Sequence, residues 1–218
     1  MSLHDEIQTL MGELGKKVPA EMMEKVGTLI GRLAEEGVGK NAPKVGEQAP
    51  SFSLQNFDGK TISLRHLLEA GPVVTVFYRG EWCPFCDLTL RAFQRALPEI
   101  ISRGASLVAI SPQTSEHSRS TSENRSLSFD VLCDSDNRAA KEFGLVFALN
   151  PAEQELHKAF EANLPEINGM ASWELPVPAI FVIDRTGRIA WSHVDSNYTS
   201  RGEPADVIHA LDGIRQAH

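Results

Sequence analysis

Two runs of apolar and β-branched residues constrain the fold more than any other feature of this sequence. The first, VVTVFY, covers residues 73–78, and the second, SLVAIS, covers residues 106–111. Continuous runs of this kind are typical of strands that are buried on both faces of a sheet. Between them, apolar residues recur at helical spacing from Pro84 to Ala96. The pattern predicts a right-handed βαβ unit with two parallel strands, and therefore an α/β fold.

The remaining segments continue this α/β order. Residues 51–64 alternate apolar and polar side chains around Asp58-Gly59, which predicts a β-hairpin. The other predicted elements are a helix over about 115–126, a strand at 129–133, a helix closed by Gly144, an irregular insertion at 145–175 with a helix from Pro151 to Ala162, an antiparallel pair of strands joined by residues 184–187, and a final helix from Pro204. We expect a mixed central sheet flanked by helices, with one antiparallel edge.

The N-terminal segment has a different character. Residues 2–36 carry two apolar stripes at helical spacing, separated by a break at Val18-Pro19. We predict an N-terminal helical extension covering residues 1–40, followed by an α/β domain covering residues 41–218. The two stripes must be buried either against that domain or against a second copy of the chain in a homodimer.

Composition and charge exclude several classes of protein. The formal net charge is −8 and there is no long basic tract, which argues against nucleic acid or an anionic membrane as a partner. No apolar run approaches the roughly 18–20 residues of a membrane span. The three cysteines are too few for a disulfide scaffold, and the first residues lack the pattern of a secretory signal. We therefore expect a reducing, cytoplasmic setting.

Cys83 and Cys86 stand where the strand at 73–78 gives way to the helix that begins at Pro84. Open α/β sheets place their chemistry at the carboxyl ends of central strands. A cysteine at the first turn of a helix faces unpaired N–H groups and the positive end of the helix dipole, both of which favour thiolate. A second cysteine one turn further on can close a disulfide, so the two thiols form a two-electron couple. The sequence predicts redox chemistry here, for which the cysteine-free residues 2–36 should be dispensable.

A structural zinc site is the alternative interpretation of the pair. A closed zinc site needs four ligands, usually supplied as two paired clusters. Cys133 is the one remaining cysteine, and the histidines at 117, 157, 193 and 209 show no HxxxH-type spacing. We therefore expect no metal and no other cofactor. Cys133 follows a short apolar run and is interpreted as a buried small hydrophobe, with a role as a resolving thiol as the alternative.

Four residues around the pair are candidates for a supporting role. Trp82, Pro84 and Phe85 could belong to the core, but beside two thiols they are better explained as an apolar rim for a docking partner. Arg79 is either a solvated loop charge or, as the nearest cation in the sequence, a group that helps to hold an anion.

At this point the chain resembles a known family. The blocks FSLQNFDGKTISL, VVTVFYRGEWCPFC, VLCDSDNRAAKEFGL and VPAIFVIDRTGRI are similar, in this order, to successive blocks of the AhpC/TSA family, the peroxiredoxins and their relatives with two close cysteines. The resemblance covers about residues 44–216. It implies a thioredoxin-like fold and thiol-based reduction of peroxides or disulfides, with electrons from a thioredoxin-type protein.

Two positions depart from ordinary peroxiredoxins. If Cys86 is matched to the family's peroxide-attacking cysteine, Cys83 occupies the position of a threonine found three residues earlier. The family's peroxide-binding arginine, just before the penultimate strand, corresponds to Pro178. A proline there resembles the cis-proline of thioredoxins, which packs against the redox cysteines and leaves the preceding backbone free to pair with a substrate. We therefore predict that the Val177-Pro178 bond is cis and lies against the cysteine pair.

The roles of the two cysteines follow from their positions in the helix. Cys83 should attack the substrate, because it lies where the unpaired N–H groups point, and Cys86 should resolve the intermediate from one turn further in. Alignment with the peroxiredoxin cysteine would reverse these roles. The leading hypothesis is a thiol-dependent hydroperoxide reductase. The alternatives are a protein disulfide oxidoreductase and, from another class, a redox-responsive binding protein.

Overall fold

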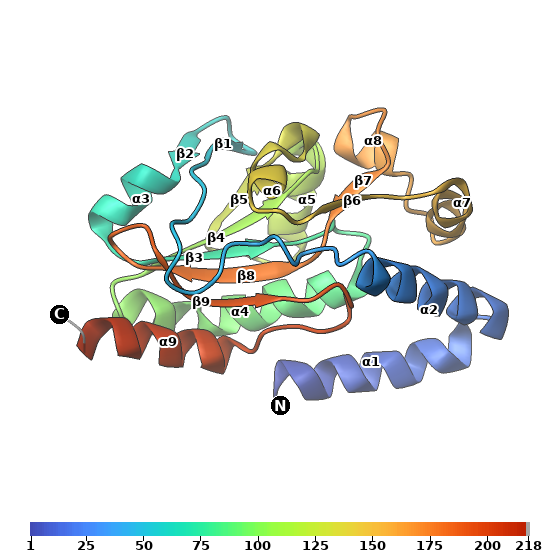
Figure 1. Ribbon diagram of the computed structural model, residues 1–218, viewed down its shortest axis with the longest axis horizontal. Helices are drawn as coiled ribbons and strands as arrows, with labels where there is room; N and C mark the ends of the chain where they lie inside the picture. The colour runs from blue at the N-terminus through green and yellow to red at the C-terminus, as the bar shows by residue number, and fades with distance from the viewer. Residues whose placement is uncertain (217–218) are drawn as a thin grey trace.

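A seven-stranded mixed sheet forms the centre of the computed structural model, which describes residues 1–216 (Figure 1). The strands lie in the order β2-β1-β5-β4-β3-β8-β9. Their bounds are β1 (Ser53–Asn56), β2 (Thr61–Ser63), β3 (Val73–Phe77), β4 (Ser106–Ser111), β5 (Asp130–Cys133), β8 (Ala179–Ile183) and β9 (Ile189–Val194). β3 pairs with β4 in parallel and with β8 in antiparallel orientation, so it lies inside the sheet. The predicted parallel pair and the mixed sheet are confirmed.

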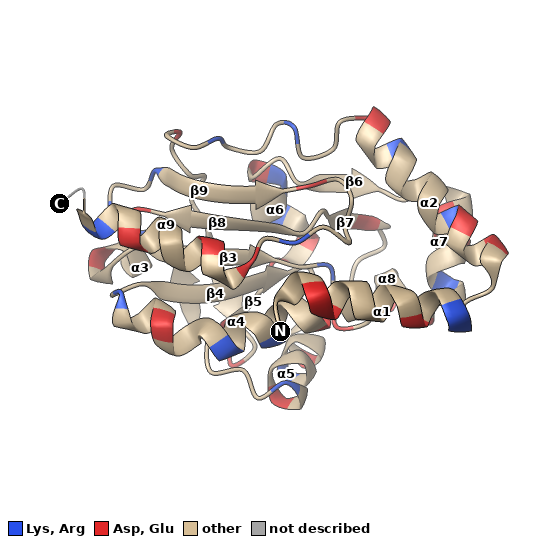
Figure 2. Cartoon of the chain, turned by 90° about the horizontal axis from the view of Figure 1, so that it is seen from below, with Lys and Arg blue, Asp and Glu red and all other residues tan. Residues whose placement is uncertain are grey.

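Helices cover both faces of this sheet. The helices of the main body are α3 (Leu64–Ala70), α4 (Pro84–Ser102), α5 (Ser115–Asn124), the short η1 (Ser135–Asn137), α6 (Arg138–Glu142), α7 (Pro151–Ala159), α8 (Leu164–Asn168) and α9 (Pro204–Gln216). In Figure 1, α4 and α9 lie below the sheet, whereas α3 and α6 lie above it. Figure 2 shows the lower face, where α4 and α9 run alongside each other. Among residues 1–216, no helix is both long and apolar enough to cross a membrane.

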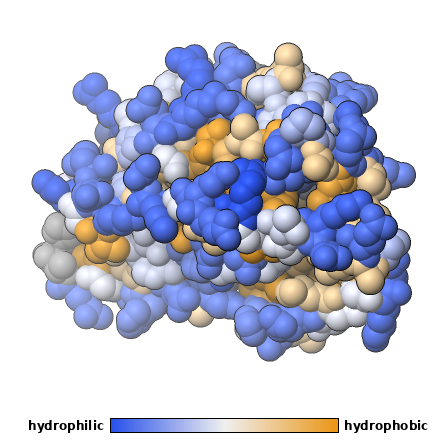
Figure 3. Space-filling model, turned by 45° about the vertical axis from the view of Figure 1, so that its right-hand side comes forward, coloured by the Kyte–Doolittle hydropathy of each residue, from blue (hydrophilic) through white to orange (hydrophobic). Residues whose placement is uncertain are grey.

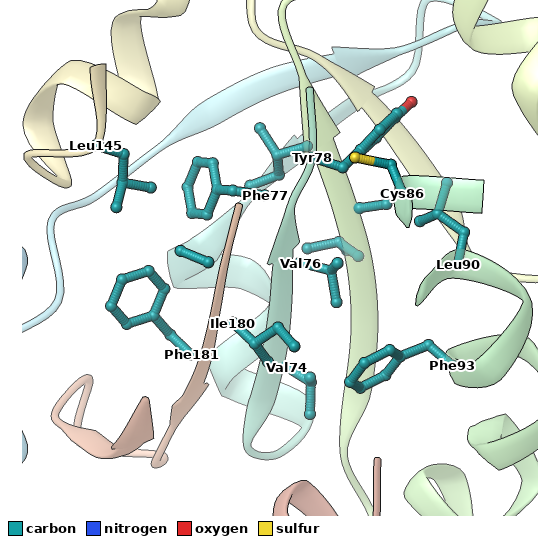
Figure 4. Packing of buried hydrophobic residues seen from close by; sticks show 14 of the residues in the cluster. Val74, Val76, Phe77, Tyr78, Cys86, Leu90, Phe93, Leu145, Ile180 and Phe181 are labelled. Carbon is teal, nitrogen blue, oxygen red and sulfur yellow. The ribbon is translucent and has the colours of Figure 1, made fainter. Parts of the chain in front are cut away.

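The core beneath the end of β3 is aromatic and tightly packed. Every residue of β3 is buried, as expected of a strand covered on both faces. Phe143 lies between Phe77 and Phe181, with ring centroids 4.9 Å and 5.0 Å from theirs. Figure 4 shows Phe77 and Phe181 on one side of β3 and Phe93 of α4 on the other. This packing gives the turn that follows β3 a rigid base.

The insertion at 145–175 is more regular than the sequence indicates. β6 (Val146–Ala148) and β7 (Glu174–Pro176) form a small antiparallel sheet beside the main one. The predicted helix from Pro151 is confirmed as α7, while α3, α8 and the β6–β7 pair were not predicted. Gly144 ends the turn after α6 with a φ of 66°. A side chain there would meet the backbone of Asn41, so glycine allows the linker to cross at this point.

The N-terminal extension consists of two helices, as predicted, and it packs on the rest of the chain. α1 (Leu3–Lys17) lies against α4, and α2 (Ala20–Glu35) lies against α7. The buried leucines and isoleucine of the two stripes belong to the same hydrophobic cluster as the main body: Leu3, Ile7, Leu29 and Leu33. These four side chains are therefore covered by this chain itself, whereas Leu14 and Val26 of the same stripes are half-buried. The division into 1–40 and 41–218 stays a prediction, and the last two residues of the second range lie outside the described residues.

Candidate active site

Cys83 lies at the N-cap of α4, in the turn that follows β3. Its carbonyl oxygen accepts hydrogen bonds from the N–H groups of Cys86 and Asp87, at 3.0 Å and 3.1 Å. Pro84 occupies the first helical position, where a missing N–H has no cost. Both cysteine side chains are 1% exposed, and within the described residues all three cysteines are free thiols. This is the strand-to-helix position that the sequence indicates.

The turn depends on a glycine three residues before Cys83. Gly80 has a φ of 152°, a conformation that side chains rarely adopt. A Cβ atom there would overlap the indole nitrogen of Trp82. Gly80 therefore lets the Trp82 ring fold back over the turn, where it lines the space next to Cys83.

Two guanidinium groups face the two sulfur atoms. Arg79 Nη1 lies 3.9 Å from Cys83 Sγ, and Arg201 Nη2 lies 3.7 Å from Cys86 Sγ. Burial alone raises the pKa of the Cys83 thiol, but a hydrogen bond from Cys86 and the positive charges of Arg79 and Arg201 outweigh it and lower the pKa to about 5. Burial and the neighbouring Cys83 thiolate raise the pKa of Cys86 well above its ordinary value. At neutral pH the pair therefore holds one thiolate, on Cys83, and one thiol, on Cys86.

Arg79 is held in place by aromatic rings and by a histidine. Its guanidinium carbon lies 4.5 Å from the centre of the Trp82 ring and 4.1 Å from that of Tyr198. Arg79 Nη2 lies 2.9 Å from His157 Nε2. Arg79 is 3% exposed, and its Nε has no hydrogen-bond partner among the described residues. Unpaired buried donors of this kind are rare in folded proteins.

His157 must be neutral to accept a hydrogen bond from Arg79. Burial and the charge of Arg79 lower the pKa of His157 to about 4, against the raising effect of its bond to Glu153. Its Nδ1 lies 2.7 Å from the carbonyl oxygen of Glu153, one helical turn earlier, so Nδ1 carries the proton and donates it there. The Nε2 lone pair is left to accept the hydrogen bond from Arg79.

The helix that carries His157 is anchored to the N-terminal extension. Arg32 of α2 contacts the Glu153 carboxylate through two hydrogen bonds of 2.7 Å each, and it also donates to the carbonyl oxygen of Ala148. The Glu153 carboxylate additionally accepts the N–H of Asn150 in the capping box of α7. α2 therefore fixes the start of α7, and α7 presents His157 to Arg79.

Cys83 lines a cavity of about 540 Å³. Most of the cavity is bounded by apolar side chains from α1, α2, α7 and the start of α4. Trp82, Pro84 and Phe85, which the sequence singles out, all lie along it together with Arg79. Figure 3 brings the side of α2 and α7 forward and shows hydrophobic residues gathered in hollows between hydrophilic ones.

The prediction for Val177 and Pro178 is wrong in its geometry. The Val177-Pro178 peptide bond is trans, the isomer that X–Pro bonds adopt by default. Pro178 does lie near the pair, because it borders a small void together with Cys86. The Val177 N–H donates to the carbonyl oxygen of Leu145 at 2.9 Å, so it is not free to pair with a substrate. This bond follows from the unpredicted β6–β7 sheet next to it.

His157, Tyr198 and Arg201 contact the site but were missed from the sequence. All three are far from the cysteines along the chain, and two of them follow β9 in an irregular segment. The one signal available for His157 was its place one helical turn after Glu153, which closes the capping box of α7. Tyr198 and Arg201 had no pattern that pointed to them.

The remaining cysteine lies apart from the pair. Cys133, at the end of β5, is half-buried, and its Sγ donates to Ser118 Oγ at 3.3 Å. Burial raises the pKa of its thiol. In the part of the chain that the structure describes, no cluster of three or more His, Cys, Asp or Glu side chains could hold a metal ion.

Comparison with known proteins assigns the chain to a family. Residues 45–192, more than half of the chain, match the model of the AhpC/TSA family. The chain belongs to the AhpC/TSA family. A putative peroxiredoxin bcp of Helicobacter pylori is 37% identical over 97 residues, which are 44% of this chain and 63% of the relative. The chloroplastic peroxiredoxin Q of Triticum aestivum is 28% identical over 143 residues, 64% of this chain and 65% of the relative. The chain thus spans a little under two thirds of the length of these curated relatives.

Solved structures share the fold at low identity. The peroxidoxin BcpB of Mycobacterium tuberculosis superimposes with a TM-score of 0.63 and 22% identity, covering 79% of this chain and 99% of that one. Peroxiredoxin Q of Xanthomonas campestris gives a TM-score of 0.56 and 16% identity over 74% and 90% of the two chains. The fold expected from the sequence resemblance, a thioredoxin-like sheet with flanking helices, is therefore confirmed.

Proposed function

We propose that this AhpC/TSA protein is a thiol peroxidase that reduces hydroperoxides through Cys83 and Cys86. One observation carries the proposal: a thiol with a lowered pKa and a thiol with a raised pKa lie one helical turn apart, at the end of a cavity that also contains a buried guanidinium. A thiolate is the nucleophile that peroxides require, and a nearby thiol can then close a disulfide. The family of the relatives agrees with this chemistry.

In the first step the Cys83 thiolate attacks the terminal oxygen of the hydroperoxide. An S–O bond forms and the O–O bond breaks, so that Cys83 becomes a sulfenic acid and the remaining oxygen leaves as an alkoxide or hydroxide. That anion takes a proton from solvent and departs as an alcohol or water. Arg79 Nη1 lies beside the sulfur and can donate to the oxygen on which negative charge develops.

In the second step the Cys86 sulfur attacks the sulfenic acid of Cys83. The S–S bond forms, the S–O bond breaks, and the Cys86 proton leaves with the hydroxide as water. A dithiol reductant of the thioredoxin type then restores both thiols and is itself oxidised to a disulfide. This reductant, a cytoplasmic location and a homodimer remain predictions from the sequence.

Protein disulfide reduction, the second candidate, is less well supported. It was motivated by a cis-proline that leaves a neighbouring backbone group free for a peptide substrate. The Val177-Pro178 bond is trans and the Val177 N–H is already paired, so that recognition element is missing from the described residues. A redox-responsive binding protein would use the same cysteine couple but would not turn over.

A steady-state assay separates these functions. NADPH, thioredoxin reductase and thioredoxin are supplied with the protein and either an organic hydroperoxide or insulin as the oxidant. We expect sustained NADPH consumption with the hydroperoxide, and its loss in the Cys83→Ser variant. Sustained consumption with insulin alone, above the rate of the thioredoxin system without this protein, would select the disulfide reductase. A single stoichiometric turnover with both oxidants, above the same background, would select the switch.

A further inference from the structure

Two helices outside the family match form much of the wall of the cavity that contains Cys83. The match begins at residue 45, whereas α1 and α2 end at Lys17 and Glu35. We infer that the α1–α2 pair is the substrate-recognition element of this protein, and that it selects hydroperoxides carrying an apolar tail over hydrogen peroxide. The inference rests on the proposed peroxidase function and names the substrate class of the same site.

The wall contributed by these helices is apolar. Its side chains are Met11 and Leu14 of α1, Val18 of the connecting turn, and Met23, Val26 and Ile30 of α2. Phe85 and Tyr198 line the same cavity from the main body. At the mouth, Met11 and Phe160 are 38% and 40% exposed, so the apolar lining continues to the surface.

The polar groups of the cavity gather around the sulfur. Arg79 contacts both of the other groups, with one guanidinium nitrogen bonded to His157 and another facing the Cys83 sulfur. Apart from Asn197, Tyr198 and Thr199, the remaining lining residues are apolar side chains and Gly27 of α2. A hydroperoxide with a hydrocarbon tail has the same division, with a polar O–O–H head and an apolar body. The head then meets the thiolate and the guanidinium, while the tail lies along α1 and α2.

The size of the cavity favours such a molecule over hydrogen peroxide. Cavities of about 300–1,000 Å³ are typical of sites for organic ligands, and this one measures about 540 Å³. Hydrogen peroxide, a molecule on the scale of two waters of about 30 Å³ each, would leave most of that volume unused. An apolar tail that binds here moves from water to the α1–α2 wall. This transfer strengthens binding roughly in proportion to the apolar area that is buried.

A peptide fits the cavity less well. An extended peptide needs unpaired backbone groups on its partner, as an exposed strand edge provides. The wall here consists of helices, whose backbone groups are bonded within each helix. Cys83 is also 1% exposed, so a sulfur carried on a bulky backbone reaches it less easily than the head of a slender molecule.

Two glycines of α2 offer a matched pair of variants. Gly27 lines the cavity, and a Cβ there would have no atom within 4 Å among the described residues. Gly31 lies one turn further along the same helix, also with open space around a Cβ, but outside the cavity lining found for the described chain. Leucine favours a helix more than glycine does, so both substitutions should fold. Gly27→Leu narrows the cavity, and Gly31→Leu is its control.

The test compares kcat/KM for cumene hydroperoxide and for hydrogen peroxide. We expect the unmodified chain to prefer cumene hydroperoxide by at least about tenfold, the scale of discrimination that an apolar pocket provides. Gly27→Leu should lose about tenfold with cumene hydroperoxide and change less than about twofold with hydrogen peroxide, whereas Gly31→Leu should leave both unchanged. An unmodified chain without the preference, or a Gly27→Leu variant that retains it, overturns the inference.

A binding measurement separates this inference from the peroxidase function. Cumyl alcohol, the reduction product of cumene hydroperoxide, is titrated into each variant and followed by calorimetry. We expect the alcohol to bind the unmodified chain and Gly31→Leu, and to bind Gly27→Leu about tenfold more weakly. This result supports the cavity assignment even if neither peroxide is reduced. In that case only the peroxidase proposal fails. If peroxide is reduced but all three chains bind the alcohol equally, the peroxidase function is supported and the recognition role of α1 and α2 is refuted.

Discussion

Removing the charge of Arg79 should raise the pKa of Cys83 and shift the pH dependence of catalysis. The Arg79 guanidinium lies 3.9 Å from the Cys83 sulfur. At an effective dielectric constant of about 20, two unit charges at this distance attract each other by about 4 kcal/mol, or about three pKa units. The hydrogen bond from Cys86 and the charge of Arg201 remain in the variant, so we expect Arg79→Gln to raise the pKa by about two units, from about 5 to about 7.

The consequence depends on the pH of the assay. A rise of about two units lowers the thiolate fraction about tenfold at pH 6 and hardly at all at pH 9. Peroxide consumption by Arg79→Gln should therefore fall about tenfold at pH 6 through the loss of thiolate, and this part of the loss should be recovered at pH 9. Arg79→Lys keeps a positive charge and should keep most of the depression of the pKa.

The pKa itself is measured by the ultraviolet absorbance of the thiolate. The titration is carried out in a background with Cys86→Ser and Cys133→Ser, so that Cys83 is the only thiol, and the unmodified Arg79 is compared with Gln and Lys in that background. If Gln and Lys give the same pKa as arginine to within about half a unit, the charge of Arg79 does not stabilise the thiolate and the electrostatic argument is wrong.

Three further predictions concern the cysteine roles, the stability and the extension. Cys86→Ser should accumulate a sulfenic acid on Cys83 with one equivalent of peroxide, seen by mass spectrometry, and Cys83→Ser should not react; a sulfenic acid formed at a normal rate on Cys86 in Cys83→Ser would reverse the roles. Because the pKa of His157 is lowered from 6.5 to about 4 in the folded state, the unfolded chain binds more protons between these values. The free energy of unfolding should therefore fall by about 2–3 kcal/mol from pH 7 to pH 4.5 through this residue. Urea titrations of His157→Gln should lack that part of the change. If the variant and the unmodified chain lose the same free energy of unfolding over this range, His157 does not contribute to it. A chain that begins at Pro43 should still form the Cys83–Cys86 disulfide but lose its preference for cumene hydroperoxide, and loss of the disulfide in a folded truncation would contradict the predicted dispensability of the extension.

The parts of the fold that could be predicted are those in which burial requires a recognisable pattern of apolar residues. β3 and β4 are mostly apolar because both faces of each strand are covered, and Pro84 marks the start of α4. The elements that were missed are short. β6 and β7 have three residues each and α8 has five, too few for a period of two or 3.6 residues to be recognised.

The site was predicted where its residues are close in sequence and missed where the fold brings them together. Arg79 was found because it lies four residues before Cys83. His157 reaches Arg79, and Arg201 reaches the Cys86 sulfur, only through the packing of α7 and of the segment after β9, which no local pattern specifies. The isomer predicted for the Val177-Pro178 bond was wrong for a related reason. A proline before a strand is compatible with both isomers, and the packing of neighbouring segments decides between them.

The two cysteines show why the apolar wall and the guanidinium groups belong together. Both thiols are buried to the same extent, and burial alone raises the pKa of each. Cys83 escapes this effect because it accepts a hydrogen bond from Cys86 and because Arg79 and Arg201 supply positive charge. For Cys86, the neighbouring Cys83 thiolate adds to the effect of burial and raises the pKa further. An apolar cavity over a thiol without the two arginines would therefore abolish its reactivity at neutral pH. Arginines without the cavity would act through water, where their attraction for the thiolate is several times weaker. The extension supplies the wall and, through Arg32, anchors α7, so it serves the selectivity of the site.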